Sequence, residues 1–214
     1  MTRIVAISDT HGQHGLLDIP DGDLLVHAGD FAARGRIQDI NPFNDWLDSL
    51  PHEEIIFVPG NHDFCFEARA QQETAINRLQ AADVLIDQVT TVDGLKIWGS
   101  PWQPEFFDWA FNLPRGKPLR EKWDLIPEDV DVLITHGPPF KIGDTVQPKN
   151  ESVGCEDLRD RVREVVPEVH VFGHIHEGYG TYQKWDVTFV NASICDGNYS
   201  PINEPIVIDV EGKS

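Results

Sequence analysis

Side chains that can bind metal ions or transfer protons recur in short segments along the chain, most of them beside a glycine. These segments are Asp9-Thr10-His11, Gly29-Asp30, Gly60-Asn61-His62-Asp63, Thr135-His136-Gly137 and Gly173-His174-Ile175-His176. Carboxylate, imidazole and amide donors together suit Mn, Fe, Zn or Mg. The three cysteines lie outside these segments and form no CxxC pair, so a thiolate zinc site is not indicated.

The spacing within the segments predicts that several side chains share ions. Asp9 and His11 flank a single residue, so both can reach one ion from an extended or tightly turned segment. His174 and His176 have the same spacing and can reach one ion or two neighbouring ions. Asp30 offers two oxygens that can bridge a pair of cations. Two cations about 3.5–4 Å apart can clamp the attacking and leaving oxygens of a phosphoryl group, so the pattern predicts phosphoester hydrolysis.

A short apolar run precedes each of these segments. The runs are Ile4–Ile7, Leu24–Val26, Ile55–Val58, Val130–Ile134 and Val169–Phe172. They are too short for typical helices and rich in Val, Ile, Leu and Phe, which predicts buried strands. Ligands of open α/β sheets bind at the carboxyl ends of the strands, so we expect the polar segments to converge on one site. Further strands are predicted at Leu95–Trp98, Val187–Val190 and Ile206–Val210.

Helical patterns separate some of the predicted strands. Asn41 is a candidate cap with Pro42 in the first helical position, followed by apolar residues on one face up to Leu50. Ala75–Leu79 predicts a second helix. Leu158–Val166 predicts a third, with acidic residues in its first turn.

The segment from Ser100 to Trp123 has no clean period and is rich in aromatic residues, which is typical of a functional loop. Trp102 and Phe106 are candidates to stack on a nucleobase, and Arg115 belongs to the nearby basic cluster. A dimer contact or a packed lid is an equally good interpretation of this segment.

The polar segments, in this order, resemble the motif series DxH, GD, GNH[D/E], H and GHxH of the calcineurin-like metallophosphoesterase superfamily. The phrases His27-Ala28-Gly29-Asp30 and Thr135-His136-Gly137-Pro138-Pro139 resemble its small metallophosphoesterase-domain-containing branch, whose members hydrolyse phosphodiesters. The resemblance implies an α/β fold, a four-layer αββα sandwich of two mixed β-sheets flanked by helices, as one domain over residues 1–214.

The resemblance also implies a role for each site residue. Asp9, His11, Asp30 and His176 would hold the first metal ion, and Asp30, Asn61, His136 and His174 the second. His62 would bind no metal and would act on the substrate phosphate, with Asp63 as its partner. A structural capping or turn role is an equally good interpretation of Asp63. Outside these motifs, His27 is predicted to be a hydrogen-bonded core residue, His170 a surface or supporting residue, and Asn191 either a support of the site or a turn residue.

The implied activity is a dinuclear-metal-dependent phosphodiesterase that hydrolyses small phosphodiesters, cyclic nucleotides among them, through hydroxide generated by the cations. Mn²⁺ is the expected ion, with Fe, Zn or Mg as alternatives. Rival hypotheses are a phosphomonoesterase, a nuclease, or a nucleotide-binding regulatory protein with little turnover. The motifs GxxxxGK[ST] and GxSxG do not occur, so a P-loop ATPase and a serine hydrolase of that type are unsupported.

Composition narrows the partners. The 214 residues carry a formal net charge of -19, which disfavours binding to long nucleic acids. No apolar run reaches the roughly 20 residues of a membrane-spanning helix, and the start of the chain does not read as a signal peptide. We therefore expect a cytoplasmic protein with reduced thiols, acting on a small phosphate ester; the oligomeric state is not encoded in any recognisable pattern.

Overall fold

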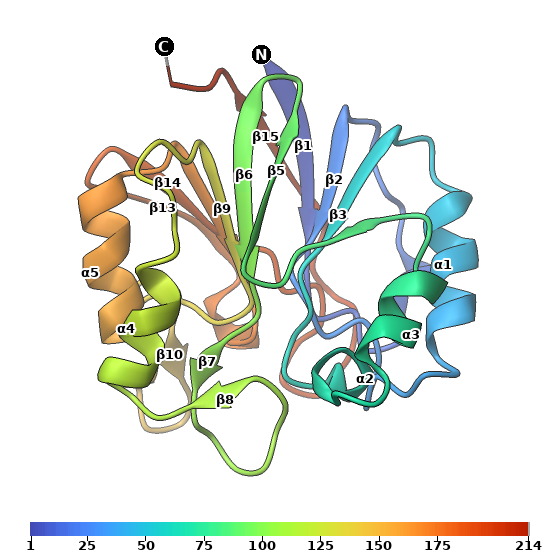
Figure 1. Cartoon of the computed structure of the whole chain (residues 1–214), viewed down its shortest axis with the longest axis horizontal. Helices are drawn as coiled ribbons and strands as arrows, with labels where there is room; N and C mark the ends of the chain where they lie inside the picture. Colours follow the sequence, from blue (N-terminus) through green and yellow to red (C-terminus); the bar gives the residue numbers. More distant parts are fainter. Residues whose placement is uncertain (214) are drawn as a thin grey trace.

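Two β-sheets of unequal size face each other in the computed structural model, which describes residues 1–213 (Figure 1). The first sheet consists, in spatial order, of β15 (Ile206–Val210), β1 (Thr2–Ile7), β2 (Leu24–His27), β3 (Glu54–Phe57) and β4 (Asp83–Val84). The second consists of β13 (Gly180–Lys184), β14 (Val187–Asn191), β12 (Val169–Phe172), β9 (Val132–Thr135), β6 (Leu95–Ser100) and β5 (Gln88–Val92). Two small ribbons pair β7 (Gln103–Pro104) with β8 (Asn112–Leu113) and β10 (Thr145–Val146) with β11 (Glu151–Ser152).

Both sheets are mixed, with parallel strands inside and antiparallel strands at edges. β1 to β4 run parallel and β15 pairs antiparallel with β1. In the second sheet β6, β9, β12 and β14 are parallel, and β5 and β13 are antiparallel to their neighbours. A parallel bridge between Ser8, after β1, and Ser193, after β14, joins the two sheets at the carboxyl ends of their parallel strands. The loops that carry the polar segments therefore emerge together.

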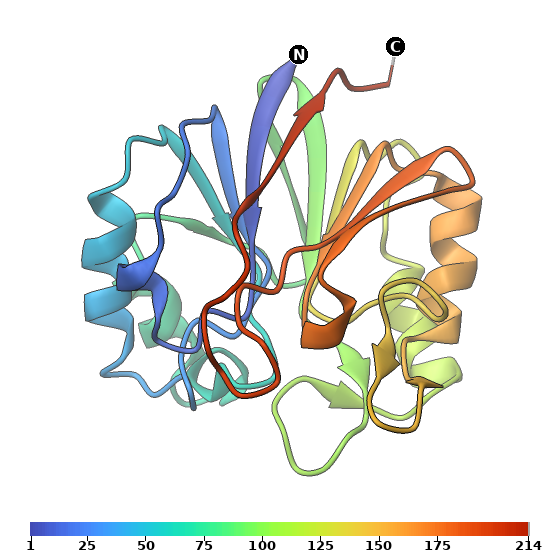
Figure 2. The same cartoon turned by 180° about the vertical axis from the view of Figure 1, so that it is seen from behind.

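Helices cover the outer face of each sheet. The first sheet carries α1 (Ile40–Asp48), α2 (Phe64–Glu67) and α3 (Gln72–Arg78), and the second carries α4 (Lys117–Trp123) and α5 (Glu156–Val165) (Figures 1 and 2). Two short 3-10 turns, η1 (His14–Leu16) and η2 (His176–Gly178), complete the elements. This arrangement confirms the expected four-layer sandwich of two mixed sheets flanked by helices.

Period-two alternation along the strands divides the buried side chains among the layers. In β1, Ile4 and Ala6 point between the sheets, whereas Val5 and Ile7 point toward the helices of the first sheet. In β9, Leu133 packs against the helices of the second sheet. Burying one such aliphatic side chain contributes about 1.5–3 kcal/mol, so the strands are held on both faces.

Two sequence predictions about local structure are wrong. α1 begins at Ile40 rather than after a cap at Asn41, and the Asp39 carboxylate accepts the Arg36 amide instead of capping the helix. Pro42 is tolerated there because amides of the first helical turn have no intrahelical partner. The segment from Ser100 to Trp123 is not all loop, since it contains β7, β8 and α4, elements too short to show a period.

Over residues 1–213, none of the helices combines the length and the apolar character required to traverse a bilayer.

Candidate metal centre

The ligand side chains leave the sheets through unusual backbone geometry. Asp9, His11, Asp30 and His174 have positive φ angles of 53°, 45°, 58° and 67°. This left-handed region is uncommon for non-glycine residues, although Asp and His enter it more readily than most. Each conformation costs of order 1–3 kcal/mol and persists only where its surroundings hold it, which is typical of functional sites.

Two glycines let the loops approach these carboxylates closely. A Cβ atom on Gly173 would overlap the Oδ2 atom of Asp9, and one on Gly60 would overlap the Oδ1 atom of Asp30. The glycines of GHxH and GNHD are therefore required by packing around the acids, which explains their place in the motifs.

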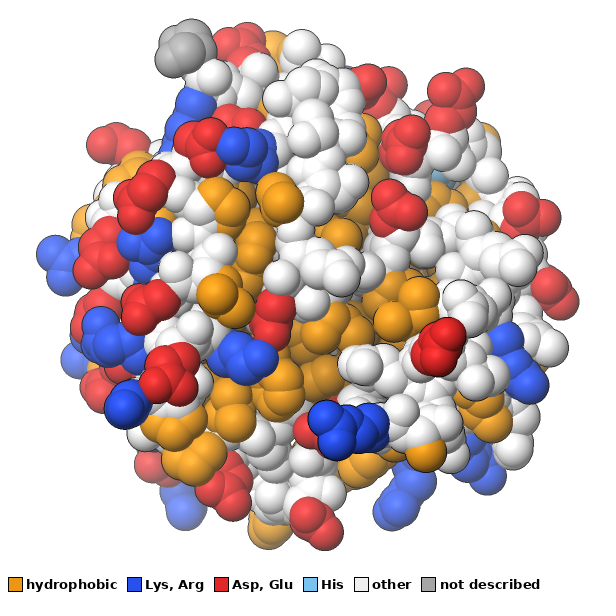
Figure 3. Space-filling model, viewed as in Figure 1, with side chains coloured by type: hydrophobic (Ala, Val, Ile, Leu, Met, Phe, Trp, Pro, Cys, Tyr) orange, Lys and Arg blue, Asp and Glu red, His pale blue; other side chains and the backbone are white. Residues whose placement is uncertain are grey.

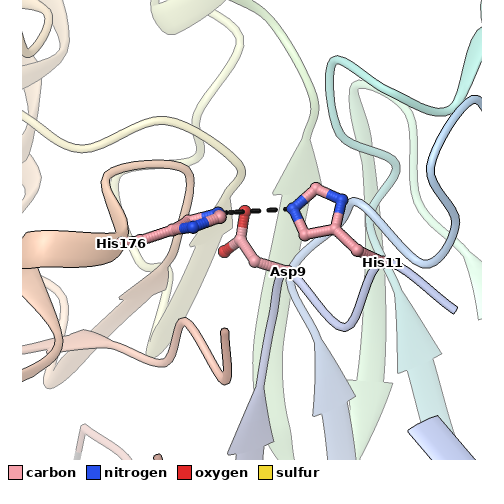
Figure 4. A group of neighbouring side chains, drawn as sticks. All are labelled: Asp9, His11 and His176. Atoms are coloured by element: carbon pink, nitrogen blue, oxygen red, sulfur yellow. Dashed lines mark hydrogen bonds and ion pairs between the residues drawn. The ribbon is translucent and has the colours of Figure 1, made fainter. Parts of the chain in front are cut away.

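One cluster consists of Asp9, His11 and His176 (Figure 4). The Nε2 atoms of His11 and His176 lie 3.3 Å apart, and the Asp9 Oδ1 atom is 3.4 Å from that of His176. The other oxygen of Asp9 accepts hydrogen bonds from the His174 amide at 2.9 Å and the Ser193 hydroxyl at 2.8 Å. Oδ1 is buried without a hydrogen-bond donor, so it is free to bind an ion.

Asp30 lies at the centre of the site. Its Oδ1 atom accepts the His62 amide at 2.8 Å. Its Oδ2 atom is 3.5 Å from His136 Nε2, 3.8 Å from His62 Nε2 and 4.0 Å from His11 Nε2. Asp30 thus contacts both predicted ligand groups, as a bridging carboxylate must.

The second group joins Asn61, His136 and His174 to Asp30. His136 Nε2 lies 2.9 Å from the Asn61 Oδ1 atom, and the rings of His136 and His174 have centroids 5.0 Å apart. All of the predicted ligands are therefore brought to one place, from loops after β1, β2, β3, β9 and β12.

The donor chemistry fits cations. The Nδ1 atom of His136 lies 2.8 Å from the Ala28 carbonyl, and that of His176 lies 2.8 Å from the Asp196 carbonyl. A carbonyl only accepts, so both rings carry a proton on Nδ1 and direct Nε2 at the acids. In its neutral form His136 would then present a lone pair to the Asn61 oxygen, and a proton or a metal ion is required between them. Such an arrangement, with the far nitrogen fixed by an outer partner, is typical of metal-binding histidines.

The pKa values of the clustered acids and histidines also indicate a site that favours positive charge beside its carboxylates. Burial opposes the ionisation of Asp9 and Asp30. Nevertheless the pKa of each carboxyl lies below its usual range, because His176 stabilises the Asp9 carboxylate and His136 stabilises that of Asp30. Burial likewise opposes protonation of His136 and His176, yet the neighbouring carboxylates raise both imidazole pKa values to about 9. Burial, with repulsion from His136, lowers the pKa of His174 to about 3.

Asp63 does not contact His62 as the resemblance implied. Its Oδ2 atom accepts the backbone amides of Asp30 at 2.8 Å and Gly60 at 2.7 Å. Burial, together with the charge of Asp30, raises the pKa of this carboxyl well above its usual value. Asp63 therefore organises the backbone of two ligand loops, and the expectation of a His62–Asp63 pair is corrected.

The partner of His62 is a backbone carbonyl. His62 Nδ1 donates to the Ala33 oxygen at 2.7 Å, which leaves Nε2 directed toward Asp30. One ring face stacks on Trp109 with centroids 4.1 Å apart. His62 also forms one of the three-residue groups able to hold an ion, with His11 and Asp30.

A cavity of about 720 Å³ opens over these residues. Its wall includes Phe106 and Arg115, as the sequence suggested, with Phe107 and Trp109 from the same aromatic segment. Tyr199 also lines the cavity, which the sequence did not suggest. Arg115 is held by the carbonyls of Gly154 at 2.7 Å and Val153 at 2.6 Å.

Trp102 does not line this cavity, contrary to expectation. Its indole N–H donates to Asp87 at 3.0 Å, its ring packs on Phe111, and Lys122 lies over its face. These contacts turn it into the apolar layers of the sandwich, so it cannot stack on a substrate at the ion site.

Several supporting residues were missed or only partly anticipated. His27 is the predicted core residue: it links Thr10, at 3.0 Å, to the Gly29 amide, at 3.2 Å, and so ties two ligand loops together. His170 is fully buried rather than at the surface, with Thr135 at 2.9 Å. Asn191 donates to the Ile175 carbonyl at 2.8 Å and thereby supports the GHxH loop. Ser193 and Tyr199 carried no motif that could have revealed them.

Comparison with known proteins agrees with this geometry. Residues 2–178 match the family described as calcineurin-like phosphoesterase. The chain is 46% identical to human metallophosphoesterase domain-containing protein 1 over 98% of this chain and 71% of that protein, and the mouse protein of that name matches equally. A solved structure of phosphopantetheinyl hydrolase from Mycobacterium tuberculosis shares the fold, with a TM-score of 0.63, 18% identity and 95% coverage of each chain. A family match over most of the chain, together with clustered Asp and His groups at the joined ends of two sheets, shows that this protein belongs to the calcineurin-like phosphoesterases, a family of metal-dependent phosphoester hydrolases.

Proposed function

We propose that this protein is a dinuclear-metal-dependent phosphodiesterase that hydrolyses small phosphodiesters, with cyclic nucleotides among the candidate substrates. The observation that carries the proposal is the position of Asp30. One of its oxygens lies within 4.0 Å of imidazole nitrogens from three different loops, beneath a cavity of about 720 Å³. Such an arrangement suits a phosphoryl group held over two cations.

Seven side chains are proposed as metal ligands. Asp9, His11, Asp30 and His176 would hold one cation, and Asp30, Asn61, His136 and His174 the other. When bound, the cations supply Lewis acidity and a hydroxide nucleophile at neutral pH. Hydrogen bonds from outside the site orient three of these ligands. Asp9 accepts the Ser193 hydroxyl, and the rings of His136 and His176 donate to the carbonyls of Ala28 and Asp196.

His62 is the residue proposed to act on the substrate itself. Its Nε2 atom faces the centre of the site and its other nitrogen is fixed by the Ala33 carbonyl. From there it can stabilise charge on a phosphoryl oxygen and deliver a proton to the departing alkoxide. No covalent intermediate with the chain is required.

The shape of the cavity favours a diester over a monoester. Phe106, Phe107, Trp109 and Tyr199 provide wide apolar walls beside the ligands, so a phosphate with two organic substituents can be accommodated. Arg115 and Lys149 are the Lys or Arg side chains that line it, and Arg115 already donates to two carbonyls. The wall therefore adds little positive charge to that of the cations, which suits a singly charged diester better than a dianionic monoester.

The ion and the compartment are also proposals. Mn²⁺ suits a set of nitrogen and oxygen donors without sulfur, as do Fe, Zn and Mg. Cys65, Cys155 and Cys195 are buried free thiols, which supports a reducing, cytoplasmic compartment.

The test is hydrolysis by metal-stripped protein reloaded with Mn²⁺. Bis-p-nitrophenyl phosphate, p-nitrophenyl phosphate and a 2′,3′-cyclic nucleotide are compared at equal concentration. Metal-dependent turnover that favours the two diesters supports the proposal. Turnover confined to the monoester would replace it with a phosphomonoesterase, and no turnover with both ions bound would favour a nucleotide-binding regulatory protein.

A further inference from the structure

The imidazole of His62 is held from three sides. The Ala33 carbonyl accepts its Nδ1 proton at 2.7 Å, and the edge of the His11 ring meets it at a centroid distance of 4.7 Å. The third side is the face of Trp109, whose ring is 4.1 Å away and tilted by 26°. Stacked aromatic rings attract each other beyond the effect of the apolar area that they bury.

The segment that carries Trp109 is fastened to the His62 loop itself. The Ala110 amide donates to the Asn61 carbonyl at 3.1 Å, and the Phe111 amide donates to the Glu67 carboxylate at 2.8 Å. Phe111 is buried, so the segment is anchored by packing as well. Trp109 is therefore held against His62 by the backbone contacts of the two residues that follow it, Ala110 and Phe111. The stack is fixed by these surrounding contacts.

We infer that Trp109 is a positioning residue for His62, a role that rests on the proposed function of that histidine. The Ala33 hydrogen bond holds the imidazole at Nδ1 alone, so the position of the rest of the ring depends on the side chains packed against it. The indole face blocks the ring from turning into the cavity, which both side chains line. It thereby keeps Nε2 directed at Asp30 and the phosphoryl position.

A substrate wall is the alternative role for Trp109, and a double-mutant cycle separates the two. Trp109→Ala, His62→Ala and the double variant are assayed on a 2′,3′-cyclic nucleotide, whose leaving group is an alkoxide. If Trp109 acts through His62, Trp109→Ala lowers kcat by about 10- to 100-fold in the natural background, the range found when an outer partner of a site residue is removed. In the His62→Ala background the same change has no further effect on kcat.

The expected leaving-group pattern sharpens this test. Trp109→Ala should reduce turnover of the cyclic nucleotide more than that of bis-p-nitrophenyl phosphate, and Trp109→Phe should restore most of the loss. Phe106→Ala is the matched control, because Phe106 lines the same cavity but packs in a T-shaped pair with Phe107 rather than on His62. It should raise KM without changing the leaving-group ratio. Equal losses from Trp109→Ala in both backgrounds would overturn the positioning role.

A measurement without turnover decides the point independently. In metal-free protein the nitrogen NMR signals of the His62 ring, assigned with His62→Gln, should show an Nδ1 proton that exchanges slowly with solvent. Trp109→Ala should make that proton exchange fast, and Trp109→Phe should reverse this. An unchanged His62 signal in Trp109→Ala would contradict the inference even if the natural protein hydrolyses diesters. The NMR result stands equally if the protein proves to have no diesterase activity.

Discussion

Asp30 is the residue on which both proposed ion sites would depend. It has a positive φ of 58°, its amide donates to Asp63, and one of its oxygens accepts the His62 amide. The remaining oxygen faces three imidazoles. The strained backbone is thus held by hydrogen bonds on both sides of the carboxylate, and the strain places one oxygen between the two ligand groups.

Asp30→Ala should abolish both ion sites rather than one. Without the carboxylate, each ion loses a shared anionic ligand, and the repulsion between the two cations is no longer offset by the charge of Asp30. We expect bound metal to fall below one ion per chain and turnover of a diester to fall by more than about 100-fold, since loss of mere outer partners already costs 10–100-fold. Elemental analysis after dialysis against Mn²⁺ measures the metal directly. Near-normal turnover would rule out the bridging role.

His62→Ala should separate catalysis from metal binding. Elemental analysis should still find two ions per chain, whereas kcat should drop by about 10²- to 10⁴-fold, the usual contribution of a positioned acid or base. The loss should be greater for an alkoxide leaving group than for a nitrophenolate, because the latter departs without a proton. Equal losses for both would show that His62 stabilises charge but donates no proton; loss of an ion would make His62 a ligand, as its grouping with His11 and Asp30 allows.

At the scale of elements, the strands position the site and the sequence predicts them well. Val169–Phe172 and Ile206–Val210 match the predicted bounds, and the other predicted strands differ by a few residues at their ends. Buried runs of branched residues leave few alternatives to a strand. The loops behave differently: the positive φ of Asp9 and His174 arises from tertiary contacts, such as Asp9 with Ser193, that join residues distant in the chain.

The aromatic segment shows where prediction from sequence fails. Composition alone could not distinguish Trp102, which turns inward to Asp87, from Phe106 and Trp109, which line the cavity. The difference depends on Asp87, which precedes the segment, and on Lys122 of α4, which only the tertiary structure brings beside Trp102. Likewise α4, with its buried Leu119, is defined by packing rather than by a visible period.

A pair of substitutions tests this assignment. Trp102→Ala should lower stability by about 3–5 kcal/mol, as truncation of large packed aromatic residues does, and leave KM for a cyclic nucleotide nearly unchanged. Phe106→Ala, at a side chain that is 55% exposed, should change stability little and raise KM. Urea unfolding and steady-state kinetics on the same preparations give both quantities. A raised KM with little change in stability for Trp102→Ala would show that Trp102 contacts the substrate after all.

At the scale of the whole molecule, the negative net charge of the protein opposes the binding of a negatively charged phosphate ester at its site. The net charge is -19, and acidic side chains on the face in Figure 3 are spread around the periphery among Lys and Arg, with hydrophobic side chains gathered nearer the centre. This surface repels phosphate esters at long range. Bound cations would make the electrostatic potential at the site positive, so the ions would be needed to bind the substrate as well as to catalyse its hydrolysis.

Stability of the metal-free protein should peak near pH 6.5. Burial lowers the pKa of His27 and His170 to about 3, so between pH 6.5 and 3 the unfolded chain binds more protons and stability falls as the pH falls. The pKa values of His136 and His176 are raised to about 9 by neighbouring carboxylates against the opposing effect of burial. Their contribution is complete below pH 6.5 and is lost as the pH rises toward 9.

Urea unfolding of chelator-treated protein over this range measures the peak. His170→Gln, which cannot titrate but keeps a donor for Thr135, should reduce the acid-side slope by about 1.4 kcal/mol per pH unit. An identical slope in the variant would show that His170 does not drive the acid limb.

The proposal of a catalytic pair of ions can be tested by measuring how turnover depends on metal content. Metal-stripped protein is titrated with Mn²⁺, and bound ions per chain are measured by elemental analysis beside hydrolysis of bis-p-nitrophenyl phosphate. Turnover should rise as the second ion binds and level off at two ions per chain. Full turnover with one ion or none, or two bound ions without any turnover, would contradict it.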